Sequence, residues 1–145
     1  MWRNLLSSCL LVCLLTSGVM AQDAVYKAKL NTVSLTVYGL APIAVYERII
    51  PFGEKFGMIA SAGGFYYGDD NLGYSVGTSL YAGAEMHRGE IGAVYINEIF
   101  PIVYGTYRYT ANSGLFARAG LGYAFIEDGD REGGIVPIIA IGYSF

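Results

Sequence analysis

The sequence predicts an all-β fold: a closed, eight-stranded, antiparallel up-and-down barrel of the kind that crosses a membrane with its strands. Three observations lead to this prediction. The chain is 54% hydrophobic, yet it contains 20 glycines and 13 tyrosines. Large apolar residues alternate with small or polar ones along eight segments, as they do along strands whose two faces meet different surroundings. The last segment ends the chain on an aromatic residue, Phe145.

The start of the chain is predicted to be a cleaved signal peptide. It opens with a positive charge, continues through an apolar core at residues 5–15, and ends on a small-residue cleavage site at 19–21. The apolar core is too short to span a membrane as a helix. We therefore expect a signal peptide at 1–21 and one barrel domain at 22–145. Both cysteines lie in the signal peptide, so no disulfide is expected in the mature domain.

Charge and hydropathy exclude several classes of protein. Nine Lys and Arg stand against twelve Asp and Glu, a formal net charge of −3, which argues against nucleic acid as a partner. No later apolar run reaches the length of about 18 residues that a membrane-spanning helix needs. A strand barrel in a membrane and a very apolar soluble β protein remain.

The first four strands are expected in a regular succession. Turn residues such as Gly, Pro, Asp and Asn separate them. The predicted strands are residues 28–38, 43–50, 56–67 and 73–86, and the connections after them are 39–42, 51–55, 68–71 and 87–89. The last of these connections contains His87, the only histidine.

The last four strands are expected at residues 90–96, 101–110, 115–126 and 135–145, with connections at 97–100, 111–114 and 127–134. On the seventh strand, Leu115 and Leu121 share one face and Arg118 lies on the other. A charge at mid-membrane that faces lipid costs about 2 to 4 kcal/mol. Arg118 is therefore expected to point into the barrel.

The same reasoning directs Glu47 and Glu85 inward, with Arg108 as a further candidate on a strand whose faces the pattern leaves open. The interior of an eight-stranded barrel is only wide enough for side chains to fill. We therefore expect Glu47, Glu85, Arg108 and Arg118 to form a buried ion-pair network that plugs the lumen. A catalytic carboxylate pair is the other interpretation, but no catalytic residue is assigned, because charges in so small a lumen are usually structural.

Tyrosines form a second pattern, since most of them fall near predicted strand ends. Such a distribution predicts an aromatic girdle at each membrane interface, although a carbohydrate-binding surface would also be rich in tyrosine. The residues are Tyr26, Tyr46, Tyr66, Tyr67, Tyr74, Tyr104, Tyr107, Tyr109, Tyr123 and Tyr143.

Two stretches, Gly120-Leu-Gly-Tyr-Ala-Phe125 and Gly142-Tyr-Ser-Phe145, resemble small bacterial outer-membrane β-barrel proteins of the OmpA/OmpX-like eight-stranded class. Tyr46-Glu47-Arg48 is similar to a stretch in barrels of Bacteroidetes-like bacteria. The resemblance implies a location in the cell outer membrane and contact with its lipids. It also implies that the barrel-assembly machinery recognises the C-terminal strand, with Tyr143 and Phe145 as the assembly signal.

The expected function is non-enzymatic, as a structural or surface-interaction protein of the outer membrane. Connections after the odd-numbered strands are expected to face outward and the others to face the periplasm. A lipid A-modifying barrel enzyme, which would use histidine and serine on the outer-leaflet side, is one alternative. It is disfavoured because His87 is expected at the periplasmic end. A soluble lipocalin-like carrier is the other alternative, and it would need a polar exterior, whereas strand 135–145 has isoleucines on both faces.

No metal or cofactor is expected. Residues 128–133 match the first six positions of a calcium-binding loop, but the twelfth position is Ile139 in place of the required Glu. This segment is predicted to be an acidic hairpin connection.

Overall fold

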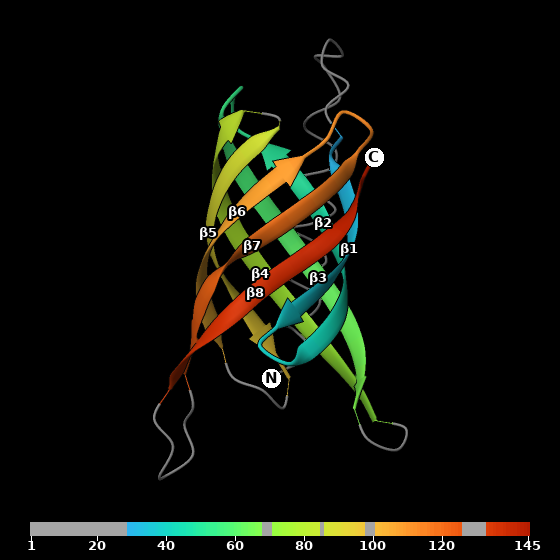
Figure 1. The fold of residues 1–145 in the computed structure, drawn as a ribbon, viewed down its shortest axis with the longest axis vertical. Helices are drawn as coiled ribbons and strands as arrows, with labels where there is room; N and C mark the ends of the chain where they lie inside the picture. The colour runs from blue at the N-terminus through green and yellow to red at the C-terminus, as the bar shows by residue number, and fades with distance from the viewer. Residues whose placement is uncertain (1–28, 68–70, 85, 98–100, 126–132) are drawn as a thin grey trace, which may run out of the picture.

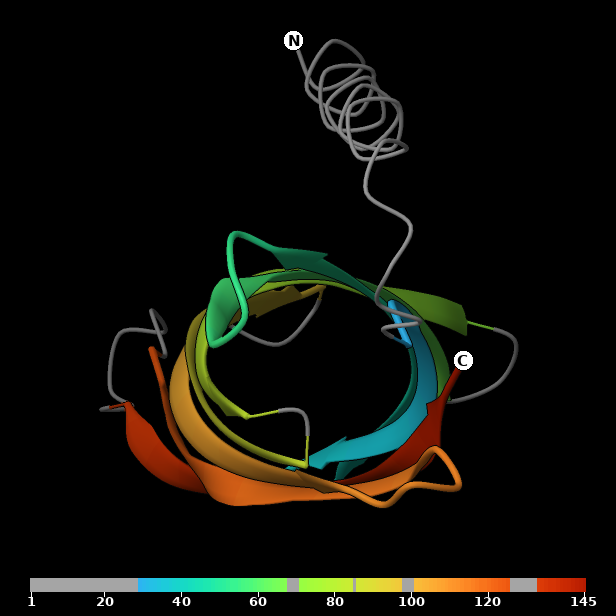
Figure 2. The ribbon, with the colours of Figure 1, turned by 90° about the horizontal axis from the view of Figure 1, so that it is seen from above.

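The structure is a computed structural model that describes residues 29–67, 71–84, 86–97, 101–125 and 133–145. The described ranges hold eight strands: β1 (Asn31–Tyr38), β2 (Ala41–Pro51), β3 (Phe56–Tyr67), β4 (Asn71–Ala84), β5 (His87–Ile96), β6 (Ile102–Thr110), β7 (Leu115–Ala124) and β8 (Gly134–Ser144). Each strand pairs with its sequence neighbours, and β8 pairs antiparallel with β1, so the sheet is a closed barrel. Figures 1 and 2 show the tilted strands and the closed ring. The predicted closed, eight-stranded antiparallel barrel is confirmed, whereas the predicted signal peptide lies outside the described residues.

The barrel closes between the two terminal strands. The backbone N–H of Asn31 donates to the carbonyl oxygen of Phe145 at 3.0 Å, and the N–H of Phe145 donates to the carbonyl oxygen of Asn31 at 2.8 Å. We call the end with the C-terminal residue and the connections β2–β3, β4–β5 and β6–β7 the terminus end, which is uppermost in Figure 1. The opposite end is the loop end.

The fifth strand starts earlier than predicted. His87, Arg88 and Gly89 were expected to form a turn, but they are the first three residues of β5 and pair with β4. Gly83, opposite Arg88, has a φ of 134°, which residues with a side chain rarely adopt. This glycine lets β4 bend before the reversal, so the chain turns before His87.

Pro137 is the fourth residue of β8, inside the strand. Its carbonyl oxygen accepts a 2.8 Å hydrogen bond from the N–H of Gly39, just beyond the end of β1. The backbone edge of Pro137 thus faces the place where the neighbouring strand stops. Proline has no N–H with which to return this hydrogen bond, and it is tolerated here because β1 ends at Tyr38.

Exposed and buried residues alternate along the strands, as the sequence pattern predicted. On β7, Leu115, Leu121 and Tyr123 are exposed on the outer face, while Phe116 and Arg118 are buried inside. Among the described strand residues that face outward, the only Lys, Arg, His, Asp or Glu side chains are Arg48 and His87, both near the terminus end. The outer wall between the two ends is therefore uncharged over the described part of the chain.

Within the described ranges, no helix is both long and apolar enough to cross a membrane.

Outward tyrosines gather near the two ends of the barrel. Near the terminus end they are Tyr46, Tyr107, Tyr109 and Tyr143, and near the loop end they are Tyr66, Tyr74, Tyr95 and Tyr123. Tyr104 was expected among them, but it is only 8% exposed and lies in the interior, because it shares the inner face of β6 with Ile102. Tyr26 lies outside the described residues.

The interior is layered along the barrel axis. An apolar cluster fills the side toward the loop end: Tyr38, Ile43, Val45, Val94, Ile96, Ile102, Tyr104, Ala124 and Ile138. A smaller cluster of Ile49, Ile59 and Tyr81 lies toward the terminus end. On the inner face of β2, Glu47 stands between Val45 and Ile49. The buried charges therefore occupy a layer between two apolar ones.

Candidate functional site

Four charged side chains meet in the middle layer of the interior. Glu47 comes from β2, Glu90 from β5, Arg108 from β6 and Arg118 from β7. None is more than 4% exposed, and Arg108 is fully buried. Such burial is tolerated only where charges are paired and hydrogen-bonded. We call these four residues the interior charge cluster.

The strand register explains why the cluster needs both carboxylates. Arg108 pairs directly with Arg88 on β5 and with Arg118 on β7, so three arginines share one row across the sheet. Like charges directly opposite one another destabilise a sheet. Glu90 lies on the same strand as Arg88, and Glu47 reaches in from β2. Glu47 and Glu90 neutralise the guanidinium groups of Arg108 and Arg118, while the guanidinium of Arg88 lies over the Tyr81 ring, 4.7 Å from its centroid.

Each carboxylate contacts both arginines. The distances from Arg118 Nη1 are 2.7 Å to Glu47 Oε1 and 3.0 Å to Glu90 Oε2. The distances from Arg108 Nη1 are 2.9 Å to Glu47 Oε2 and 3.6 Å to Glu90 Oε1. The two positive and two negative charges balance. Glu90 depends mainly on Arg118, because its distance to Arg108 is the longest of the four.

Neutral side chains connect the interior charge cluster to β1 and β8, the two strands that close the barrel. Arg108 Nη2 donates to Thr32 Oγ1 on β1 at 2.9 Å and to Ser144 Oγ on β8 at 3.3 Å. The Phe116 ring lies 3.8 Å from the Arg108 guanidinium carbon, close enough for a cation–π interaction. Arg108 thereby connects β6 with β1, β2, β7 and β8 across the interior.

The cluster is suited to hold the walls together and to fill the lumen. A catalytic acid or base must come within hydrogen-bonding distance of a substrate, but these carboxylates are enclosed between apolar layers. Glu90 Oε1, Arg108 Nε, Arg118 Nε and Arg118 Nη2 are buried and make no hydrogen bond within the described ranges. Ion pairing compensates part of this cost, since Glu90 Oε1 still lies 3.6 Å from Arg108.

The structure brings together three of the four residues expected in the lumen network: Glu47, Arg108 and Arg118. Glu85, the fourth, lies outside the described residues. Glu90 also takes part, and the sequence reasoning missed it because it was placed at the edge of a strand after a turn. The signal was present, since Glu90, Gly92, Val94 and Ile96 alternate with the outward residues Ile91, Ala93 and Tyr95 along β5.

The residues of the expected assembly signal lie at the barrel seam. Tyr143 pairs with Val33 on β1 and with Leu115 on β7, and its side chain is exposed on the outer wall. Phe145 follows the end of β8 and is also exposed.

His87 is an exposed residue on the outer wall near the terminus end. Its Nδ1 is hydrogen-bonded to the Tyr107 hydroxyl, and its ring centroid lies 5.2 Å from that of Tyr109. These neighbours are aromatic, and none supplies the serine nucleophile of the enzymatic alternative. Among the described residues, no three His, Cys, Asp or Glu side chains gather as metal ligands.

Comparison of the chain with protein-family models, with curated proteins and with solved structures finds no match in any of the three. The fold and its side chains therefore carry the functional argument.

Proposed function

We propose that this protein is an outer-membrane β-barrel with a structural or surface-interaction role, and that its lumen is closed by side chains. The observation that carries the proposal is the distribution of charge over the barrel wall. Glu47, Glu90, Arg108 and Arg118 are buried inside, while the outward residues between the two ends are uncharged in the described part of the chain. A water-soluble barrel has the opposite distribution, because its exterior must be polar.

The apolar surface is too extensive for a soluble monomer. Large exposed apolar residues occur on every strand, among them Leu35, Leu80, Ile91, Leu121 and Ile139, each more than half exposed. Soluble monomers rarely expose contiguous apolar patches larger than a few hundred Å². A closed barrel also satisfies its backbone hydrogen bonds internally, as hydrocarbon surroundings require. The two groups of outward tyrosines match the aromatic girdles of such barrels.

A filled interior favours a non-enzymatic and non-conducting protein. The lumen of an eight-stranded barrel has room only for side chains, and here two apolar layers enclose a charge-balanced layer. In the proposed orientation the terminus end faces the periplasm, so His87 lies away from the outer leaflet. The C-terminal strand with Tyr143 and Phe145 is the proposed contact for the barrel-assembly machinery, and the proposed partners of the wall are outer-membrane lipids.

Cell fractionation tests this proposal. The protein is expected with the outer membrane, resistant to extraction by urea or alkaline carbonate, and silent in planar-bilayer conductance measurements. Recovery in the soluble periplasm without detergent would instead favour the lipocalin-like carrier. Stepwise ion conductance would contradict the closed lumen.

A further inference from the structure

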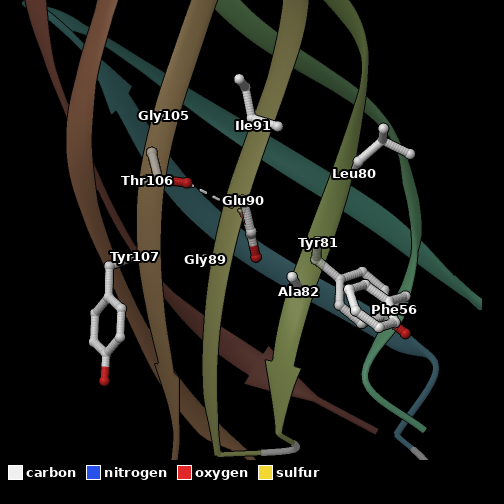
Figure 3. Close-up of a pocket in the computed structure, with 10 residues that line it drawn as sticks. All are labelled: Phe56, Leu80, Tyr81, Ala82, Gly89, Glu90, Ile91, Gly105, Thr106 and Tyr107. Atoms are coloured by element: carbon white, nitrogen blue, oxygen red, sulfur yellow. Dashed lines mark hydrogen bonds between the residues drawn. The ribbon is translucent and has the colours of Figure 1, made fainter. Parts of the chain in front are cut away.

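The outer wall is hollowed over the strands β3 to β6. The groove has a volume of about 560 Å³, within the range of roughly 300 to 1,000 Å³ typical of small-molecule sites. Four large side chains frame it, as Figure 3 shows: Phe56, Leu80, Ile91 and Tyr107. All four are more than half exposed. The groove is therefore an apolar depression in the wall that we propose faces lipid.

Two glycines on neighbouring strands make the depression. A Cβ atom at Gly105 would meet nothing within 4 Å, and one at Gly89 would meet only the Ala82 carbonyl oxygen at 3.9 Å. Each glycine pairs across the sheet with a large residue, Gly105 with Ile91 and Gly89 with Tyr107. The two glycines thus leave an open space above β5 and β6. The large side chains beside this space, Ile91 and Tyr107, project from the wall.

The end of the groove toward the terminus end is polar. In Figure 3 the Tyr107 hydroxyl points toward the end of the barrel at which β4 ends, and His87 Nδ1 is hydrogen-bonded to it. An imidazole and a phenol therefore lie near one end of an apolar groove. This pair can donate a hydrogen bond to a phosphate oxygen at the end of a lipid chain.

We propose that the groove holds one acyl chain of a phospholipid, whose phosphate lies beside His87 and Tyr107. The inference rests on the proposed membrane location. The width of the floor favours an acyl chain over a protein helix, because adjacent strands are about 4.8 Å apart and a helix with its side chains is about 10 to 12 Å across. A second barrel would present a convex wall that cannot reach the glycine floor.

Native mass spectrometry of the purified protein tests the proposal. Wild type and variants are reconstituted with phosphatidylethanolamine and phosphatidylglycerol and then transferred to detergent. The mass of each protein is measured together with any lipid that it retains. Wild type is expected to keep one phospholipid. Gly105→Leu is expected to keep at least about tenfold less, because extra methylenes in an apolar site discriminate by such factors. Diacylglycerol with the same chains, which lacks the phosphate, is expected to be retained about tenfold less than phosphatidylglycerol, because a site that hydrogen-bonds a ligand group rejects the analogue without that group.

Gly64→Leu is the matched control. Gly64 also faces outward. A Cβ atom added to it would have the Gly73 carbonyl oxygen as its nearest neighbour, at 3.7 Å. Gly64 lies outside the groove. This variant is expected to retain phospholipid like wild type. A heat-dependent shift on a detergent gel verifies that each variant is folded.

Several outcomes would overturn the inference. Equal phospholipid retention by Gly105→Leu and wild type would exclude the groove as the binding site. Loss of a dimer in Gly105→Leu, with lipid retention unchanged, would make the groove an interface between copies of this chain. Equal retention of diacylglycerol and phosphatidylglycerol would exclude a contact between the protein and the phosphate. If the wild-type protein inserts into membranes but retains no phospholipid, the lipid site is rejected and the membrane location stands. If the protein stays soluble without lipid, the membrane location is rejected as well.

Discussion

Removal of the Arg118 guanidinium is expected to destabilise the barrel strongly, and Arg118→Met is the variant that tests it. The substitution keeps a long side chain but deletes the contacts of 2.7 Å to Glu47 and 3.0 Å to Glu90. One guanidinium then faces two buried carboxylates. Breaking a buried ion pair by removing one partner costs about 3 to 5 kcal/mol. We expect a loss of this size in the free energy of unfolding.

The distances also identify which second substitution should restore stability. Arg108 keeps Glu47 at 2.9 Å, but its distance to Glu90 is 3.6 Å, so Glu90 is the carboxylate left poorly compensated. Combining Arg118→Met with Glu90→Gln leaves the Arg108–Glu47 pair and a neutral cluster. We expect the double variant to recover about 0.5 to 3 kcal/mol relative to the sum of the single effects, the range for residues in one network.

Equilibrium unfolding in urea, with the protein in lipid vesicles and followed by circular dichroism, measures these effects. Leu121→Ala is the control on the same strand, because its side chain is 60% exposed on the outer wall. It should cost less than Arg118→Met, since lipid can fill the space that it vacates. A neutral Arg118→Met, or a double variant no more stable than the sum of its parts, would refute the idea that the cluster stabilises the interior.

Two further predictions concern the wall and the single histidine. Gly120→Ala should destabilise by about 1 to 3 kcal/mol, because its Cβ would lie 2.1 Å from the Gly105 carbonyl oxygen and 2.6 Å from Thr106 Cα. Gly105→Ala, with nothing within 4 Å of its Cβ, should be neutral or stabilise by up to about 1 kcal/mol, and the same urea titration compares the two. His87→Ala should leave the acyl chains of the cell's lipid A unchanged by mass spectrometry, because in the proposed orientation it lies at the periplasmic end. An acyl chain gained or lost with expression of the protein, and restored by His87→Ala, would support the enzymatic alternative.

Much of the architecture could be predicted because a strand of a barrel with an apolar wall alternates strictly. On β7 the outward row of Leu115 and Leu121 requires Arg118 to face the interior. The same period-two logic places Glu47 inside on β2. An even number of such segments of suitable length then favours closure, since no edge strand can remain in lipid.

The partners inside the barrel could not be predicted from alternation. Arg108 and Glu47 are 61 positions apart, and their contact depends on the register of every strand between them. Glu90 was missed because the turn was placed two to three residues too late, in the stretch from His87 to Gly89. Glycine and charged residues are common in turns, so His87, Arg88 and Gly89 were predicted to form a connection. In the structure these three residues pair with β4.

Accessibility of spin labels in lipid vesicles tests the membrane location of the outer wall most directly. The only cysteines of the chain are at positions 9 and 13, before the predicted cleavage site, so single labels can be placed at Leu121→Cys and Ile139→Cys on the wall. Gly53→Cys, in the exposed β2–β3 connection, serves as the aqueous control. We predict that oxygen, which concentrates in lipid, relaxes the two wall labels while a water-soluble nickel complex reaches only the control. Relaxation of the wall labels by the nickel complex would mean that the apolar wall faces water, and would contradict the proposed outer-membrane barrel.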